Sequence, residues 1–425
     1  MSTTAAPSQG GIWKQSLSFD PAVRLLFLNQ LTINLGFYML MPYLAAHLAD
    51  GLGMAAWAVG LVLGARNLSQ QGMFLVGGAL ADRLGFKPLI VAGCALRTLG
   101  FGALAFAQSL PMLIAASLAT GLAGALFNPA VRAYLAAEAG ERRVEAFALF
   151  NTYYQAGILL GPLVGVALTG VSFRLTCLVA AVLFALLTLV QLRHLPVRRE
   201  ATEPAGAAGA DGKARGQFRT VLANRVFWLF SLAMTGSYVL SFQVYLALPL
   251  AADSTAVTTA LFVVSALVAL VGQLRITAWC KRRLSRERCL VLGLALMGVA
   301  FLPPALVGGG RSLPGLLLCA ALLAAANAVL YPYEMDTVVA LAENRWVATH
   351  YGLYNTVCGI GITLGNLGTG ALLDVTGWSA VPWLTLCAVG LGCAVAMAAL
   401  ARGGRLAVRP AVSQSAARQS PTATG

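Results

Sequence analysis

Apolar runs long enough to cross a lipid bilayer recur along the whole chain, and short polar or Gly/Pro-rich breaks separate them. A spanning helix needs about 20 mostly apolar residues, because each residue adds about 1.5 Å of length. The pattern predicts an all-α, polytopic membrane protein with twelve spans. We place these at residues 22–48, 55–80, 89–108, 111–136, 145–169, 173–194, 223–249, 255–279, 289–308, 313–340, 347–372 and 379–401.

Composition and charge agree with this class, since 59% of the 425 residues are hydrophobic and 10% are charged. The first apolar run is too long for the core of a signal peptide, so we expect it to remain as a span. With the N-terminus inside, only Arg174 and Arg311 fall in outer loops. The positive-inside rule therefore predicts cytoplasmic termini in the cell (inner) membrane. The net charge of +14 then reflects orientation and contact with anionic lipid, and we expect no nucleic-acid partner.

A stretch rich in Ala, Gly, Pro and charged residues divides the chain near its middle. It covers residues 195–222 and predicts a flexible cytoplasmic linker. On either side we expect a six-helix bundle, at 22–194 and 223–402, preceded by a cytoplasmic segment at 1–21. The tail at 403–425 has the composition of the linker and is predicted to be disordered.

The two halves resemble each other, best between residues 127–165 and 330–369. Alignment places Pro129 on Pro332, Arg142 on Arg345, Asn151-Thr152 on Asn355-Thr356, Gly157 on Gly361 and Gly161 on Gly365. A duplicated bundle puts a cavity where its halves meet, and rocking of the halves exposes that cavity to each side in turn. The repeat therefore predicts a transporter.

Two local patterns carry more chemistry than the spans require. The loop Gly78–Pro88 holds an aspartate, an arginine and a lysine, although glycine and any solvated residues would turn the chain. In the fifth span, glycines recur every four residues and form a smooth face for a neighbouring helix, while a proline removes one backbone hydrogen bond. Close packing alone explains the glycines but not the added proline.

These patterns resemble signatures of the major facilitator superfamily. The loop is similar to G-x-x-x-D-R-x-G-R-[RK], and Phe86 departs at the first basic position. The fifth span is similar to G-x-x-x-G-P-x-x-G of the antiporters. The matching residues are Gly78, Asp82, Arg83, Gly85 and Lys87 in the loop and Gly157, Gly161, Pro162 and Gly165 in the span. Within the superfamily, the stretches GLVLGARNLSQQGMFLVGGALADRLGFKPLIVAG, LFNPAVRA and FRLTCLVAAVLF resemble twelve-span drug:proton antiporters of the branch of the multidrug resistance protein MdtH.

The resemblance implies a proton-driven exporter of small amphipathic molecules or drugs. It also implies that Asp82 contacts Arg132, at the cytoplasmic end of the fourth span. We further predict that Asp82 forms a cytoplasmic latch with Arg132 and the start of the eleventh span, whose helix dipole favours a negative charge, and that this latch stabilises the outward-open state. One departure affects the coupling, because Ser117 stands where drug:proton antiporters carry an arginine in the fourth span. The chain must therefore couple protons differently or not at all.

Polar residues within spans are costly, and placing one charge there costs about 2.5 kcal/mol or more. Each such residue is therefore a functional candidate, and the alternative roles are a structural ion pair or a side chain that extends to the membrane surface. Arg66 lies near the predicted midplane, which favours a cavity role, whereas a functional role and a scaffold role fit Arg97 equally well. Glu334 is the best candidate for proton exchange, although its position suggests a depth close to the cytoplasmic face. The first span lacks a carboxylate, which argues against a cation-only substrate. The candidates for substrate or coupling are Gln30, Asn34, Tyr38, Arg66, Arg97, Tyr238 and Glu334, with Tyr153, Tyr154, Gln155, Gln243 and Asn355 as further cavity residues.

Other functions receive less support from the sequence. An importer or facilitator of a metabolite would share the fold, and the fifth-span motif argues against it. An enzyme needs a constellation such as HExxH or GxSxG, and a receptor would be expected to carry a larger soluble output domain; the sequence shows none of these. We expect no metal or cofactor, a monomeric chain, and a small molecule, protons and the bilayer as partners.

Overall fold

The computed structural model describes residues 12–54, 56–197, 219–252, 255–307, 310–376, 379–403 and 406, and this part of the chain is helical without strands. The helices are α1 (Ile12–Leu17), α2 (Pro21–Tyr38), α3 (Met41–Ala46), η1 (His47–Gly51), α4 (Ala56–Leu84), α5 (Phe86–Leu104), α6 (Leu110–Ala139), η2 (Gly140–Arg142), α7 (Arg143–Thr169), α8 (Phe173–His194), α10 (Arg225–Phe242), α11 (Ala247–Ala251), α12 (Thr255–Arg283), α13 (Arg286–Val299), α14 (Leu302–Leu306), α15 (Leu313–Leu341), α16 (Val347–Thr376) and α17 (Ala380–Arg402). Every predicted span contains one principal helix.

Nine described segments are long and apolar enough to cross a membrane, and one of them, Leu110–Thr169, covers both α6 and α7. Helices α2 and α4 fall outside this set, because polar side chains interrupt their apolar sequences. Large apolar side chains nevertheless point outward along many helices, as at Leu68, Leu99 and Val395. The chain is a multi-pass membrane protein.

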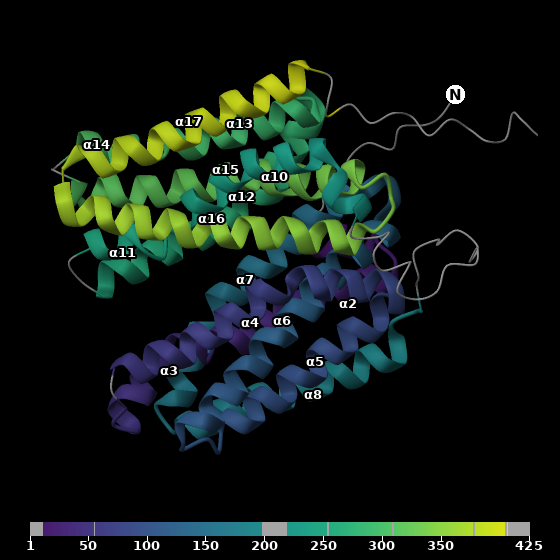
Figure 1. The fold of residues 1–425 in the computed structure, drawn as a ribbon, viewed down its shortest axis with the longest axis vertical. Helices are drawn as coiled ribbons and strands as arrows, with labels where there is room; N and C mark the ends of the chain where they lie inside the picture. The colour runs from purple at the N-terminus through teal and green to yellow at the C-terminus, as the bar shows by residue number, and fades with distance from the viewer. Residues whose placement is uncertain are drawn as a thin grey trace, which may run out of the picture.

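The helices form two groups, with α2 to α8 in the first half and α10 to α17 in the second (Figure 1). The halves converge at the end where α8 stops and α10 starts, which we call the linker end. They diverge toward the opposite end, which carries α3 and α11. Contacts between the halves are made chiefly by α4 with α16 and by α7 with α12 and α15.

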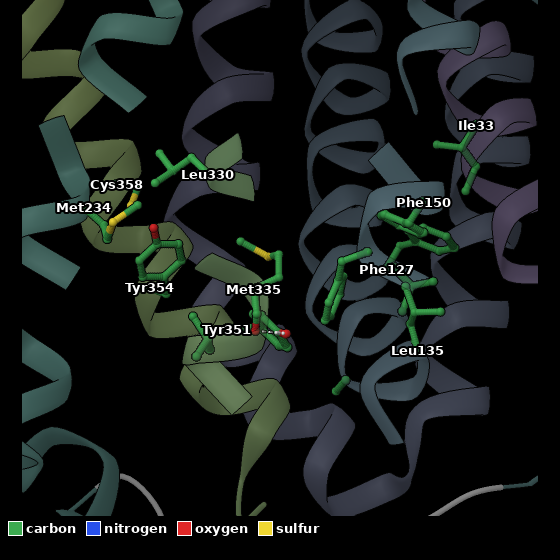
Figure 2. Packing of buried hydrophobic residues seen from close by; sticks show 14 of the residues in the cluster. Ile33, Phe127, Leu135, Phe150, Met234, Leu330, Met335, Tyr351, Tyr354 and Cys358 are labelled. Carbon is green, nitrogen blue, oxygen red and sulfur yellow. Dashed lines mark hydrogen bonds between the residues drawn. The ribbon is translucent and has the colours of Figure 1, made fainter. Parts of the chain in front are cut away.

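Buried apolar side chains of both halves belong to one continuous cluster. Figure 2 shows Phe127 and Phe150 packed within the first half, and Met234 and Tyr354 within the second.

Helices α4 and α16 approach so closely that backbone meets backbone. A Cβ atom added at Gly78 would lie 2.1 Å from the carbonyl oxygen of Ala348, and one added at Gly352 would lie 2.4 Å from that of Phe74. Only residues without side chains fit at these two crossings. Gly78, predicted to lie in a loop, lies within α4, and its missing side chain permits the close contact of the halves at the linker end.

Parts of the predicted domain scheme lie outside the described residues. Of the linker at 195–222, only 195–197 and 219–222 are described, and of the tail at 403–425 only 403 and 406. Within the predicted N-terminal segment, α1 packs against the first half, since the Ser16 hydroxyl lies 3.1 Å from the Tyr153 hydroxyl of α7.

Candidate functional site: a cavity between the halves

A cavity of about 210 Å³ lies between the two halves. The first half contributes α6 and α7, and the second contributes α10, α12 and α15. Its lining includes Arg132, Asn151, Tyr154, Gln155, Ser237, Tyr238, Ser241, Tyr245, Phe262, Asn327, Tyr331 and Glu334. Such a site, walled mainly by apolar and aromatic side chains with a few polar groups, suits a small amphipathic ligand.

Glu334 is the acidic residue of this lining and is 2% exposed. Its Oε1 atom accepts hydrogen bonds from the Tyr238 hydroxyl at 2.8 Å and from the Tyr354 hydroxyl at 2.6 Å. A buried carboxylate is costly without such donors, and bonds to a charged acceptor are among the stronger ones. The sequence suggested a depth near the membrane face, whereas the structure places Glu334 in the cavity, because the halves converge only beyond it.

Arg132 of α6 is the basic residue of the same lining. Its Nε and Nη1 atoms are buried without a hydrogen-bond partner, and Tyr331 lies beside it. An arginine does not lose its proton in proteins, so the cavity holds a cation with unmet donors. No ion pair joins Arg132 to Glu334 within the described residues.

The predicted contact between Arg132 and Asp82 is therefore not formed in this structure. Helix α6 continues to Ala139, so Arg132 lies about 10 Å inside its linker end, with its side chain in the cavity. The predicted span ends at residue 136, which would put Arg132 at its cytoplasmic end, where the family resemblance implies a partner for Asp82.

Asp82 instead binds the start of the eleventh span. Its carboxylate accepts hydrogen bonds from the backbone amides of Ala348 at 2.9 Å and Thr349 at 2.7 Å, and from the Thr349 hydroxyl. These amides belong to the first turn of α16, whose donors have no partner within the helix. The positive end of the helix dipole also favours the negative charge. The expected contact between this loop and the eleventh span is present.

The other loop residues build the turn that presents Asp82. Gly85 has a φ of 93°, a conformation that side chains with a Cβ atom rarely adopt. Lys87 donates to the carbonyl oxygen of Leu192 at 2.8 Å, near the end of α8, where unpaired carbonyls accept basic groups. Arg83 is exposed at the end of α4.

The glycines of the fifth span pack α7 directly on α2. Added Cβ atoms at Gly157 and Gly161 would each lie 2.6 Å from a side-chain Cβ atom of α2, and one at Gly165 would lie 2.3 Å from the Met39 carbonyl oxygen. The carbonyl oxygen of Pro162 accepts a hydrogen bond from the Tyr43 hydroxyl at 3.0 Å. The glycine face thus fixes the interface between two helices of the first half.

Two predicted arginines do not line the cavity. Arg66 donates to Asn67 and Gln70, each at 2.9 Å, and its guanidinium lies 4.3 Å from the centre of the Phe37 ring. Arg97 is buried inside the first half, with the rings of Phe127 and Phe184 nearby. Both therefore have surroundings that fit a scaffold role.

The candidates in the first span also lie outside the cavity lining. Asn34 donates to the backbone carbonyl of Gln30 at 2.7 Å, and Gln30 is buried with an unpartnered Oε1 atom. Tyr38 lies beside Tyr154 and Tyr245, which line the cavity. Of the predicted substrate candidates, the cavity thus unites Tyr238 and Glu334.

Sequence reasoning missed Asn327, Tyr331 and Tyr245 as cavity residues. A signal was present, because Asn327, Tyr331 and Glu334 follow one another at spacings of four and three in an otherwise apolar helix. Such a polar stripe marks one face of a span. Tyr238 on α10 and Tyr245, which follows α10, are further residues with polar groups that line the cavity.

Ionic contacts join the halves at the linker end. Asp336 contacts Arg143 of the first half at 3.0 Å and Arg286 of the second at 3.7 Å. Glu145 contacts Lys281 across the halves at 2.5 Å. Within the cavity lining, the Asn151 amide also joins the halves by donating to Gln273 Oε1 at 2.7 Å. These contacts close the cavity toward the linker end.

Comparisons with known proteins agree with this architecture. Residues 26–358 and 242–424 match the family described as Major Facilitator Superfamily. An uncharacterized MFS-type transporter of Mycobacterium tuberculosis (strain ATCC 25618 / H37Rv) is 51% identical over 399 residues, covering 90% of this chain and 93% of the relative. The multidrug resistance protein MdtH of Klebsiella pneumoniae (strain 342) is 32% identical over 374 residues, covering 86% and 90%.

Solved structures show the same fold. The human organic anion transporter TETRAN superposes with a TM-score of 0.65 at 19% identity, covering 88% of this chain and 98% of that one. A peptide transporter superposes with a TM-score of 0.66 at 16% identity, covering 94% and 100%.

Proposed function

Because the chain belongs to the major facilitator superfamily, whose named relatives here are transporters and not enzymes, we propose that it exports small amphipathic molecules by alternating access, in exchange for protons. The likeness to MdtH, a multidrug resistance protein, supports export. So does the glycine and proline pattern of α7, which resembles the antiporter signature.

The observation that carries the proposal is Glu334 in the cavity between the halves. Its carboxyl group is buried, held by two phenols, and lies where rocking of the halves would expose it to either side. A carboxyl group in such a place can hold a proton on one side and release it on the other. We assign Glu334 as the proton carrier, in place of the arginine that Ser117 replaces.

The proposed orientation follows from charge. The linker end is rich in lysine and arginine, so the positive-inside rule makes it cytoplasmic, with both termini in the cytoplasm and the protein in the cell (inner) membrane. The halves then meet on the cytoplasmic side and diverge on the outer side (Figure 1). In this orientation the structure is the outward-facing state, and the Asp82 contact with α16 is its latch.

A metabolite importer or facilitator is the second candidate. Ser117 is 2% exposed and takes the position where drug:proton antiporters have an arginine. If this change removed proton exchange, the same cavity would serve uptake or passive movement instead. The direction of proton movement separates the two functions.

The test is transport in inside-out vesicles that contain the full chain, with a panel of anionic, neutral and cationic aromatic compounds and an imposed pH gradient. The proposal expects accumulation of panel compounds only when the vesicle interior is acidic, and loss of this accumulation in Glu334→Gln. Arg275→Gln, on an exposed position of α12, is the control variant. Intact pH-driven accumulation in Glu334→Gln would refute the assignment of the proton carrier.

A further inference from the structure

The charged groups of the cavity are one base and one acid, and they come from opposite halves. Arg132 lies on α6 and Glu334 on α15, with no ion pair between them in the described part of the chain. A pair left apart in this way can hold a ligand between its members. The chemistry of each group then defines one end of that ligand.

Arg132 requires a negative partner. Two of its nitrogen atoms, Nε and Nη1, are buried and have no hydrogen-bond partner. A guanidinium presents parallel N–H donors that match the two oxygens of a carboxylate. Buried donors without partners are costly, so a ligand that supplies an acceptor gains affinity by satisfying them.

Glu334 offers the opposite end. Both phenol hydrogen bonds go to Oε1, which leaves Oε2 without a hydrogen bond from the described residues. When ionised, this oxygen can accept a hydrogen bond from a ligand ammonium group. The same oxygen is also where a proton would bind, so ammonium and proton exclude each other.

The walls between these ends are aromatic. Tyr154, Phe242, Tyr245 and Phe262 line the cavity together with Tyr331. Aromatic side chains favour offset or edge-on contact with another ring. A ligand with a ring between its charged groups would therefore satisfy the walls as well as both ends.

We propose that the cargo is a zwitterionic aromatic compound whose carboxylate binds Arg132 and whose ammonium group binds Glu334. This inference builds on the proposed exchange with protons. The step is an exchange without covalent chemistry: the ammonium group arrives already protonated, Glu334 gives up its proton to water, and the carboxylate forms hydrogen bonds with Arg132. Return of the proton to Glu334 then releases the cargo.

Singly charged compounds fit the exchange less well. An anion on Arg132 would bind best while Glu334 is protonated, because two negative charges in one cavity repel, and this would move cargo and proton together. A cation on Glu334 would displace the proton but leave the donors of Arg132 unmet beside a like charge. Only a ligand with both groups satisfies Arg132 and competes with the proton.

The first measurement is ligand affinity, by calorimetry on the full chain in lipid nanodiscs. The probes are para-(aminomethyl)benzoic acid and its biphenyl homologue, each with its methyl ester, which is only cationic, and its N-acetyl derivative, which is only anionic. We expect at least one zwitterion to bind about tenfold or more tighter than both of its derivatives. Equal binding within both sets would overturn the inference, and this comparison needs no protein variant.

The second measurement locates the carboxylate. Arg132→Gln should weaken binding of the zwitterion but not of the methyl ester, while Arg132→Lys keeps the charge and should lie between. Arg275→Gln is the matched control, since it removes an exposed arginine outside the cavity. If Arg132→Gln weakened the ester as much as the zwitterion while the protein kept its melting temperature, the assignment would be wrong.

The third measurement is proton release on binding, followed with a pH indicator in weak buffer. Wild-type protein should release protons when the zwitterion binds, and Glu334→Gln should not. Zwitterion binding without proton release would overturn the competition at Glu334. The failure of this inference can be told apart from the failure of the proposed function. Export of esters alone, driven by the pH gradient, would support export and reject a zwitterionic cargo. A preference for zwitterions without pH-driven export would support the zwitterionic cargo and reject proton-driven export.

Discussion

Asp82 of α4 and Thr349 of α16 meet across the two halves, where the aspartate accepts hydrogen bonds from the backbone amide and the hydroxyl of the threonine. The aspartate is 4% exposed, so this contact is largely shielded from solvent. Its place at the linker end, where α4 of one half meets α16 of the other, relates it to the movement of the halves. Asp82 is not among the described residues that line the cavity.

Asp82→Asn should reduce transport of all compounds alike. Asparagine keeps an acceptor but loses the charge that favours the first turn of α16. A loss of about 1–2 kcal/mol would change the ratio of the two conformations about 5–30-fold. Transport of three chemically different compounds measures the effect, and spin-label distances between the linker ends of α4 and α16 measure the conformation. A loss confined to one compound would contradict the latch.

Gly78→Ala should open the same contact, because there is no room between α4 and α16 for the added methyl group. The added Cβ atom would lie 2.1 Å from the Ala348 carbonyl oxygen, so α4 and α16 must separate. Gly72→Ala is the matched control on α4, because no atom lies within 4 Å of a Cβ atom there. We expect reduced transport and a wider linker end for Gly78→Ala only. Similar behaviour of both variants would show that the close approach is unimportant.

Gly161→Ala should destabilise the first half. The new methyl group would lie 2.6 Å from the Tyr38 Cβ atom, and overpacking of this kind costs about 1–3 kcal/mol. Gly368→Ala in α16, where no atom lies within 4 Å, provides the control. The melting temperature of the purified protein should fall for Gly161→Ala alone. An unchanged melting temperature would mean that α2 and α7 adjust freely.

Asp336→Asn should weaken the closure of the linker end more than Glu145→Gln. Asp336 joins arginines from both halves, and its side chain is 14% exposed, whereas the Lys281 partner of Glu145 is 53% exposed. Exposed ion pairs contribute about 0–1 kcal/mol to stability, because water and salt screen the charges. Labelling of a cysteine placed in the cavity from the linker side should rise more for Asp336→Asn. The reverse order would contradict this ranking.

The fold could be predicted from the sequence because its signals are local. Apolar length fixes each span, and the principal helices from α4 to α8 begin and end within a few residues of the predicted bounds. The glycine spacing of α7 likewise predicted close packing by a neighbouring helix, though not that the neighbour would be α2.

The site was harder to predict because it depends on which faces of distant helices meet. Arg66 and Arg132 are both arginines inside long helices, and depth along the helix favoured the first. The structure turns Arg66 toward Asn67 and Gln70 and turns Arg132 into the cavity. The depth of a residue follows from its position along one helix, whereas the direction in which its side chain points depends on how several helices pack.

The central claim is that Glu334 carries the proton, and one measurement tests it most directly. In proteoliposomes without an imposed pH gradient, a gradient of the best-transported compound should drive protons in the opposite direction, recorded with a trapped pH dye. Glu334→Gln should abolish this proton flux, whereas Arg275→Gln, outside the cavity lining, should leave it unchanged. Proton flux that persists in Glu334→Gln, or wild-type transport with no proton flux, would contradict the claim.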